Sequence, residues 1–435
     1  MRARTRGPAV AGPEPVAGAA SHGVARVIED LFGADLPVTV QAYDGSRAGP
    51  ADAPARVVIR SKDAVRRLVT SPNELGISRA YVAGDVDVEG DIYEALQLAK
   101  RVDVQSLGPA QWRALLRLTG PSGLRPLPAP PEEARLRGRL HHRARDAAAI
   151  SHHYDVSNEF YRLLLGPAMT YSCAVWDSPD RTLEEAQAAK HDLVCRKLGL
   201  RPGMRLLDVG CGWGGMLLHA AREYGVTAVG VTISQRQAEW ARDAVAKAGL
   251  GGRVEVRLQD YRDVGDGPYD AISSIGMFEH VGLEQLGAYF THLYELLRPG
   301  GRLLNHGIAT RDEPDGRPRP TFINRYVFPD GALHEVGAVV SAIHRKRFEV
   351  RHVENLREHY ALTLRAWSAN LEQHWEEAVA QVGLTRARIW RLYIAASALA
   401  FDSGRVQIHQ TLAVRPDHQP LDARSGMPLR PDWGA

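Results

Sequence analysis

Four glycines within six residues mark the first stretch of the chain that could bind a ligand. The sequence LLDVGCGWGG occupies residues 206–215. An apolar run precedes the glycines and a helical pattern follows them, so the loop should join a strand to the start of a helix. Free backbone N–H groups and the helix dipole at such a place favour a negatively charged or carboxylate-bearing ligand. We therefore predict a ligand site that contains Asp208, Gly210, Gly212 and Gly214.

Residues that follow the next two predicted strands point to a nucleoside as that ligand. An NAD-binding enzyme would place an acidic residue about 20 positions after the loop to bind the ribose, but Thr232 stands there. Asp260 and Tyr261 follow the third strand, where a carboxylate can accept a hydrogen bond from the exocyclic amine of a base. The sequence therefore predicts S-adenosylmethionine rather than NAD. The alternative is that the glycines serve only a tight turn.

An acid and a histidine follow two further predicted strands. Glu279 lies just past the fourth strand, and His306 lies at the end of the fifth. These strands are neighbours in the usual order of a doubly wound sheet, so both side chains should meet at its ligand-binding edge. The alternatives are a first-turn helix carboxylate for Glu279 and a structural strand-end histidine for His306.

Alternating strands and helices must position these residues. This alternation predicts an α/β fold with a parallel, doubly wound sheet. Together with the predicted S-adenosylmethionine site, we expect the Rossmann-like fold of class I methyltransferases. The expected strands are 205–210, 227–233, 254–260, 269–276 and 301–309, and the expected helices are 157–166, 183–200, 213–225, 234–249 and 283–300. Ser157 and Ser234 are expected N-caps.

Composition shifts divide the chain into five parts. We expect a disordered tail over 1–22, a small α+β domain over 23–117, a Pro/Arg-rich linker over 118–146, the catalytic domain over 147–415 and a tail over 416–435. Within the small domain, residues 76–99 suggest a turn-rich ribbon followed by a helix. In the linker, residues 135–145 carry five arginines and no acid. This run favours an anionic lipid surface, or it is a solvated linker helix. No nucleic-acid motif accompanies it.

The whole-chain composition indicates a cytoplasmic protein. The chain has 435 residues, 44% hydrophobic residues and a net charge of +3. No uncharged apolar run is long enough to span a membrane, and the N-terminus lacks the apolar core of a secretory signal. Three cysteines without a CxxC pair argue against a disulfide framework or a structural metal site.

The second half of the chain resembles the cyclopropane-fatty-acyl-phospholipid synthase family, which includes the mycolic acid cyclopropane synthases. The motifs that carry the resemblance are SHHYDVSNEFYRLLLG, TYSCAVW, LLDVGCGWGG, VGVTISQ, SIGMFEHVG, NHGIA, YVFPDGAL, ENLREHYALTLRAW and VQIHQTLAV. They spread over residues 151–414. The segment ELGISRAYVAGDVDVEGDI resembles the lipid-binding domain of the phospholipid-modifying members, which the mycolic branch lacks.

The resemblance implies the roles of the site residues. Bicarbonate, the expected proton acceptor, would be held by Cys173, Glu279, His306, Ile308 and Tyr360. The methionine part of S-adenosylmethionine would contact Tyr171 and Ser172, and its amino acid group would lie against the loop Gly210–Gly214. The ribose would lie beside Thr232, Ile233 and Gln237, and the adenine beside Asp260 and Tyr261. Some relatives have a cysteine where Ser397 stands here, and this difference disfavours a covalent cysteine mechanism.

The implied reaction is methyl transfer to the cis double bond of an unsaturated phospholipid acyl chain, which gives a cyclopropane. Aromatic rings in YSCAVW, MFEH and HHYD would stabilise the carbocation. The alternatives are an exo-methylene product that a partner reductase could convert to a methyl branch, and a catalytically inactive lipid-binding module. We expect peripheral binding to the inner face of the plasma membrane, strengthened in a homodimer. Residues 322–333 are either an interfacial contact or channel wall, or a turn with a buried aromatic side chain.

Overall fold

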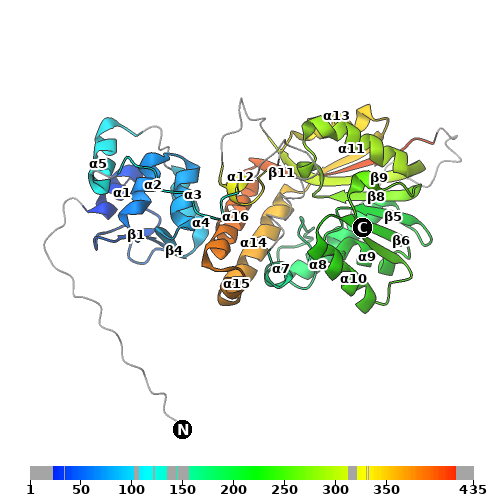
Figure 1. Cartoon of the computed structure of the whole chain (residues 1–435), viewed down its shortest axis with the longest axis horizontal. Helices are drawn as coiled ribbons and strands as arrows, with labels where there is room; N and C mark the ends of the chain where they lie inside the picture. The colour runs from blue at the N-terminus through cyan, green and yellow to red at the C-terminus, as the bar shows by residue number, and fades with distance from the viewer. Residues whose placement is uncertain are drawn as a thin grey trace, which may run out of the picture. The chain divides into compact units, whose positions relative to one another are not determined.

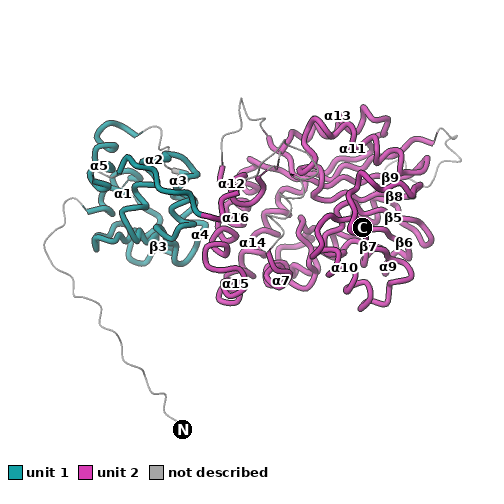
Figure 2. Tube along the Cα trace, viewed as in Figure 1, with its two compact units in different colours: residues 1–130 teal, residues 131–435 magenta. Residues whose placement is uncertain are grey.

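The structure is a computed structural model. It describes residues 23–33, 35–101, 107–120, 123–134, 145, 156–311, 321–329, 331 and 333–417. The chain divides into two compact units, Met1–Pro130 and Pro131–Ala435 (Figure 2). The predicted N-terminal tail and all of the arginine run except Arg145 lie outside the described residues.

The first unit is a small α+β domain. Its elements are α1 (Val24–Phe32), β1 (Thr39–Ala42), β2 (Arg47–Ala48), β3 (Ala55–Ile59), α2 (Lys62–Thr70), α3 (Glu74–Val82), β4 (Val86–Gly90), α4 (Ile92–Arg101) and α5 (Pro109–Thr119). The strands form one sheet in the order β2-β1-β3-β4. The predicted ribbon over 76–99 is wrong at its start, because α3 is a helix. The Asn73 side chain caps it by accepting a hydrogen bond from Gly76 N at 3.2 Å.

The second unit contains the glycine loop and the remaining motifs. Its first elements are α7 (Asn158–Leu165), α8 (Leu183–Leu198), β5 (Arg205–Val209), α9 (Gly215–Glu223), β6 (Thr227–Thr232), α10 (Gln235–Lys247), β7 (Val254–Leu258), η2 (Tyr261–Asp263) and β8 (Tyr269–Ile275). There follow η3 (Phe278–His280), α11 (Leu283–Leu296), β9 (Leu297–Thr310), α12 (Phe322–Tyr326), α13 (Val336–Arg345), β10 (Glu349–Asn355), α14 (Arg357–Gln373), α15 (Trp375–Val382), α16 (Leu384–Asp402) and β11 (Val406–Val414). The predicted caps are confirmed, since Ser157 accepts from Phe160 N and Ser234 accepts from Gln237 N.

Seven strands form the sheet of the second unit, in the order β10-β11-β9-β8-β5-β6-β7 (Figure 1). β7, β6, β5, β8 and β9 pair in parallel, which confirms the predicted doubly wound class. β11 is antiparallel to both β9 and β10. The last strand among the described residues therefore lies inside the sheet rather than at its edge.

Helices cover both faces of this sheet. One core joins the strands to α11 and α13, through side chains such as Phe290 and Ile343. The other core joins the strands to α8, α9 and α10, through side chains such as Val194 and Leu217 (Figure 1). A parallel sheet that is buried on both faces presents its ligands at the carboxyl ends of its strands.

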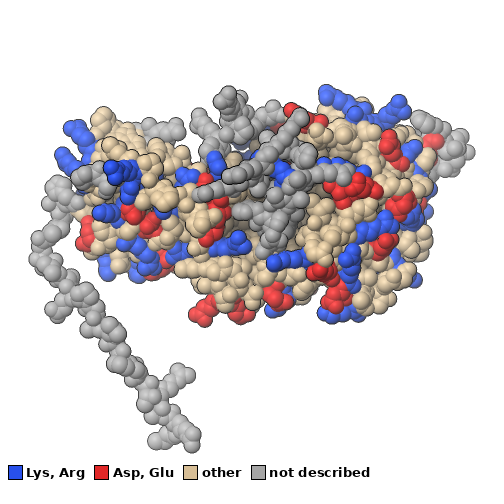
Figure 3. All heavy atoms as spheres, in the orientation of Figure 1, with Lys and Arg blue, Asp and Glu red and all other residues tan. Residues whose placement is uncertain are grey.

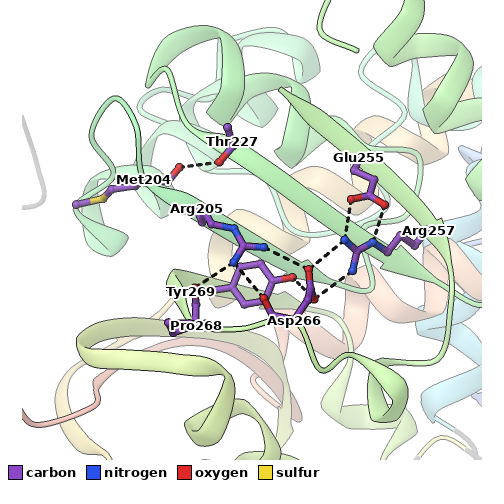
Figure 4. A network of polar contacts seen from close by, with 8 residues as sticks. All are labelled: Met204, Arg205, Thr227, Glu255, Arg257, Asp266, Pro268 and Tyr269. Carbon is purple, nitrogen blue, oxygen red and sulfur yellow. Dashed lines mark hydrogen bonds and ion pairs between the residues drawn. The ribbon is translucent and has the colours of Figure 1, made fainter. Parts of the chain in front are cut away.

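A polar network joins the strands at the edge of the sheet opposite to their carboxyl ends (Figure 4). Arg205 and Tyr269 are the first residues of β5 and β8, and both bond to Asp266 (Arg205 Nη2 at 3.2 Å, Tyr269 Oη at 2.7 Å). Arg257 on β7 bonds to Asp266 and to Glu255. The hydrogen bond from Arg257 is the main reason that the pKa of Asp266 falls to about 2. The network stabilises the edge opposite to the ligand-binding edge.

The surface carries mixed charge. Basic and acidic side chains are interspersed over the described residues of the face in Figure 3. In the described part of the chain, no helix combines the length and the apolar character needed to cross a bilayer.

Candidate active site

The glycine loop joins β5 to α9, as the sequence predicts. Gly210 follows β5 with a φ of 79°, and Gly214 is the N-cap of α9 with a φ of 89°. A Cβ atom at Gly210 would collide with the side chain of Met277. The loop therefore needs glycine both for its left-handed backbone and for the close approach of a neighbouring segment.

A cavity of about 400 Å³ opens at this loop. The predicted cofactor residues that line it are Tyr171, Ser172, Asp208, Gly210, Gly212, Thr232, Ile233, Gln237, Asp260 and Tyr261. Gly214 is the one predicted residue that lies outside this lining, at the N-terminus of α9. The structure thus brings the ends of β5, β6 and β7 together around one cavity.

Polar groups in the cavity wall have local partners. Asp208 is buried, and it accepts a hydrogen bond from Ser273 Oγ at 2.6 Å. Burial raises the pKa of Asp208 to about 6, although Ser273 and Lys190 oppose that rise. Thr232 Oγ1 donates to Gln237 Oε1 at 2.9 Å. The carboxylate of Asp260 accepts a hydrogen bond from Arg262 at 2.6 Å. The carboxylate that is predicted to contact adenine is therefore already paired with an arginine.

Lys190 also lines the cavity, and sequence reasoning missed it. It is 1% exposed, and its Nζ donates to Ser172 Oγ at 3.0 Å. Burial lowers the pKa of Lys190 to about 8. The spacing of the two lysines could have indicated that Lys190 is buried. Lys190 and Lys197 are seven residues apart on the apolar face of α8, and residues seven apart lie on the same side of a helix.

Glu279 and Ile308 meet beyond the end of the parallel pairing between β8 and β9. The last paired residues are Ile275 and His306. Just past them, the free backbone N–H of Ile308 donates to Glu279 Oε1 at 2.8 Å. Glu279 lies in η3, the single turn that follows β8. The predicted acid therefore docks on the strand that carries the predicted histidine.

Cys173 and Tyr360 both contact the backbone carbonyl of Leu356, and Leu356 is hydrogen-bonded to the strand next to Ile308. Cys173 Sγ lies 3.7 Å from Leu356 O, and Tyr360 N donates to that oxygen at 3.1 Å. Leu356 N in turn donates to the carbonyl of Ile408, which is opposite Ile308 in the sheet. We name the resulting group the Glu279 cluster; it comprises Cys173, Glu279, His306, Ile308 and Tyr360.

Two residues of the Glu279 cluster are sequence neighbours of residues that line the cavity. Ser172, which precedes Cys173, and His280, which follows Glu279, both line the cavity. The cluster is buried: the exposed fractions of Glu279 and His306 are 8% and 1%. Burial also raises the pKa of the Cys173 thiol, which keeps it neutral and a poor nucleophile.

Two atoms of the cluster are buried without a hydrogen-bond partner among the described residues. They are Glu279 Oε2 and His306 Nε2. Burial raises the pKa of Glu279 to about 7 and lowers that of His306 well below its usual value. A protonated carboxyl group and a neutral imidazole can each offer one hydrogen, which suits a small anion.

Aromatic rings surround Tyr171 at the cavity wall. The ring centroids of Tyr161, Trp367 and Trp390 lie 5.8, 5.2 and 6.0 Å from that of Tyr171. Tyr171 Oη donates to Tyr393 Oη at 3.0 Å. Of these rings, that of Tyr171 lines the cavity and can stabilise a cation there. The motif HHYD, residues 152–155, lies outside the described residues.

The segment 322–333 does not expose the aromatic face considered as an interfacial contact. Phe322, Tyr326 and Val327 are 2%, 5% and 3% exposed, and α12 packs these side chains inward. Tyr326 Oη also donates to Glu133 at 3.2 Å. The burial of these side chains contradicts an exposed interfacial contact and supports the interpretation as a turn with buried aromatic side chains.

Comparison with known proteins gives one consistent result. A family model described as mycolic acid cyclopropane synthetase matches residues 141–411. The chain is 46% identical over 408 residues to the probable fatty acid methyltransferase Rv3720 of Mycobacterium tuberculosis, an alignment that covers 91% of this chain and 95% of the relative. It is 34% identical over 374 residues to cyclopropane-fatty-acyl-phospholipid synthase of Escherichia coli, with 85% and 91% covered.

A solved structure agrees with these matches. The mycolic acid cyclopropane synthase CmaA1 complexed with SAH and CTAB superposes with a TM-score of 0.58 at 36% identity, covering 62% of this chain and 98% of that one. That protein was solved with SAH bound, and its fold is shared by this chain.

Proposed function

Because the chain belongs to the mycolic acid cyclopropane synthetase family, we propose that it converts cis double bonds of membrane phospholipid acyl chains into cyclopropanes. The chain is an S-adenosylmethionine-dependent methyltransferase. A phospholipid substrate is supported by the length of the match to the Escherichia coli phospholipid synthase. That match spans 374 residues and therefore extends into the first unit, whereas the match to a mycolic acid synthase spans 274.

Several features of the cavity wall support the proposed reaction. S-adenosylmethionine, when bound, supplies an electrophilic methyl group, and an isolated alkene attacks it only at close, aligned approach. The loop at Gly210 and the Lys190–Ser172 pair fix one wall. The Tyr171 ring would stabilise positive charge on the acyl chain, and the rings packed against it would hold it in place.

We assign the Glu279 cluster to hold bicarbonate, which would supply a proton acceptor. Glu279 accepts from Ile308 N–H through Oε1, so a protonated Oε2 can donate to the anion. His306 Nε2 is the second donor. A raised pKa of Glu279, about 7, suits this role, because a neutral carboxyl group does not repel an anion.

The observation that carries the proposal is that Glu279 Oε2 and His306 Nε2 are both buried without a hydrogen-bond partner among the described residues, while His280, the residue after Glu279, lines the cofactor cavity. The experiment is expression in a host that makes oleoyl phospholipids, with lipid mass spectrometry and proton NMR. We expect a mass gain of one CH₂ and cyclopropane ring protons. A Glu279→Ala variant should leave the lipids unchanged. Unaltered lipids with the wild-type chain would instead support a lipid-binding module without activity.

A second product is supported by the names of two relatives. The Mycobacterium tuberculosis relative and a 40% identical relative from Pseudomonas putida are both named probable fatty acid methyltransferase, without a cyclopropane. The same site would then give an exo-methylene chain, if a hydride moves from the methyl-bearing carbon to the cationic carbon and the new methyl group then loses a proton. A partner reductase would convert that chain to a methyl branch. Exo-methylene protons in the same NMR spectrum distinguish this product.

The enzyme must also reach its lipid. We propose peripheral binding to anionic headgroups at the cytoplasmic face of the membrane through the first unit and the arginine run 135–145, strengthened in a homodimer. Cosedimentation with vesicles that contain phosphatidylglycerol should be strong at low salt and weak at high salt. Sedimentation that does not depend on headgroup charge would contradict this mode of binding.

A further inference from the structure

Three side chains stand in register across three strands of the sheet. Glu354 on β10 is opposite Gln410 on β11, and Gln410 is opposite His306 on β9. Residues directly opposite on paired strands project from the same face. Lys197 of α8 reaches this row, and its Nζ bonds to Gln410 Oε1 at 2.7 Å and to the Glu354 carboxylate. We name these four residues the His306 relay.

The relay is closed to water at its centre. Lys197 and Gln410 are both 0% exposed, whereas the Glu354 side chain is 35% exposed. A buried ammonium group is costly unless it is paired and hydrogen-bonded. Glu354 supplies the opposite charge, and Gln410 supplies a neutral acceptor. Lys197 is therefore held in place by two partners on neighbouring strands.

Lys197 fixes the orientation of the Gln410 amide. An ammonium group has only hydrogens to donate, so the Gln410 atom that it contacts must be the carbonyl oxygen. The amide nitrogen then lies 3.3 Å from His306 Nδ1 and has hydrogens to donate. Nδ1 is therefore the acceptor in this contact. A neutral imidazole that accepts at Nδ1 carries its own hydrogen on Nε2.

We propose that Gln410 and Lys197 are positioning residues that hold His306 as its Nε2–H tautomer. The hydrogen then sits on the buried atom that has no partner in the described part of the chain, so it is available to an anion beside Glu279. Only this last step depends on the proposed function; the tautomer follows from the relay alone. Gln410→Glu should favour the other tautomer, because a carboxylate accepts hydrogen bonds and would draw the hydrogen of His306 to Nδ1.

The surroundings keep His306 neutral, as the tautomer requires. Burial is the main cause that lowers the pKa of His306, and positive charge on Lys190, Lys197 and His409 lowers it further. Burial also raises the pKa of the Glu279 carboxyl group to about 7, which favours its neutral form. A neutral histidine with one fixed hydrogen is a directional donor.

The tautomer is measured by NMR on the full chain labelled with ¹⁵N-histidine, in buffer free of bicarbonate. The chain has 17 histidines, so a His306→Gln sample identifies the ring signals. We expect the directly bonded hydrogen on Nε2 in the wild type and on Nδ1 in Gln410→Glu. In a second step, titration with ¹³C-bicarbonate should show affinity reduced roughly 10- to 100-fold in Gln410→Glu, the range seen when outer partners of metal-bound histidines are removed.

Gln407→Glu is the matched control. It makes the same substitution on the same strand, opposite Ala309, and should leave both the tautomer and the anion affinity unchanged. Hydrogen on Nδ1 in the wild type would overturn the inference, and this readout does not require Gln410→Glu to fold. A folded Gln410→Glu that keeps Nε2–H would overturn it too. If the tautomer is as expected but bicarbonate fails to bind the wild type, the relay stands and the proposed function fails.

Discussion

The Lys190 ammonium donates a 3.0 Å hydrogen bond to the Ser172 hydroxyl, and both groups reach the wall of the cofactor cavity. Lys190 comes from the buried face of α8, and Ser172 comes from the loop before it. The same ammonium lowers the pKa of Asp208, which burial alone would raise above about 6. One lysine therefore orders a hydroxyl group and favours the charged form of an acid in the same wall.

Lys190→Met should weaken S-adenosylmethionine binding roughly tenfold near pH 6.5, because it loses one charge-assisted hydrogen bond and raises the pKa of Asp208. The loss should shrink at pH 8.5, where Asp208 is ionised and Lys190, with a pKa near 8, is largely neutral in the wild type. Titration calorimetry at both pH values measures this. Lys247→Met, at a side chain 76% exposed on α10, is the control. Equal binding by Lys190→Met and the wild type at pH 6.5 would contradict the assignment.

Glu279→Ala should reduce kcat by roughly a hundredfold or more, because the variant loses a group that would hold bicarbonate, the proposed proton acceptor, and a positioned proton acceptor contributes about that much to the rate. The dissociation constant of S-adenosylmethionine should change less than about threefold, because Glu279 is not part of the cavity lining. Single-turnover assays and equilibrium binding separate the two effects. Glu284→Ala, in the exposed first turn of α11, should change neither. Parallel loss of turnover and cofactor affinity would refute the role given to Glu279.

Glu279 should also make the stability of the protein depend on pH. Its pKa is about 7 in the folded protein and 4.5 in the unfolded chain. Between these values the folded state binds more protons, so this group's contribution to the free energy of unfolding falls as pH rises from 4.5 through 7. Glu279→Gln removes that titration. Relative to the wild type, the variant should gain on the order of 3 kcal/mol between pH 5 and pH 8.

Urea denaturation in bicarbonate-free buffer at both pH values gives this difference. All other titrating groups are common to the two proteins and cancel in the comparison. A stability difference that is the same at pH 5 and pH 8 would show that Glu279 ionises normally.

Local signals explain which parts of the fold and the site could be predicted. The alternation of strands and helices, the Ser157 and Ser234 caps and the glycine loop all follow from residues close together in the sequence. The adjacency of Glu279 and His306 followed from strand order alone, because a doubly wound sheet places their strands side by side.

Long-range pairing and side-chain orientation explain the rest. Nothing near Gln410 indicates that β11 enters the sheet beside His306, because 104 residues separate the two. The apolar face of α8 indicates that Lys190 and Lys197 are buried, but not which partners they find. The aromatic residues of 322–333 were ambiguous for the same reason: a five-residue helix gives too short a pattern to show which side faces the core.

Gly307→Ala tests how tightly the Glu279 cluster is packed. A Cβ atom at this position would collide with the ring of Phe278, the residue before Glu279. The ring must shift and carry the Glu279 carboxyl group away from Ile308 N–H. We expect kcat to fall at least tenfold and stability to fall by about 1–3 kcal/mol, the usual cost of overpacking.

Gly337→Ala in α13 is the control, since an added Cβ meets nothing within 4 Å there. It should leave turnover unchanged and raise stability by about 0.4–1 kcal/mol. Wild-type turnover in Gly307→Ala would show that the position of Phe278 does not control the cluster.

The interior place of β11 has a consequence for biosynthesis. While the ribosome is still translating α16, β9 has β8 on one side and an open edge on the other. Gln410 has not yet been made, so the emerging polypeptide has no means of setting the hydrogen on His306. Activity should therefore begin only after residues 406–414 insert between two strands that are already present. Until then the exposed edges of β9 and β10 are natural targets for chaperones.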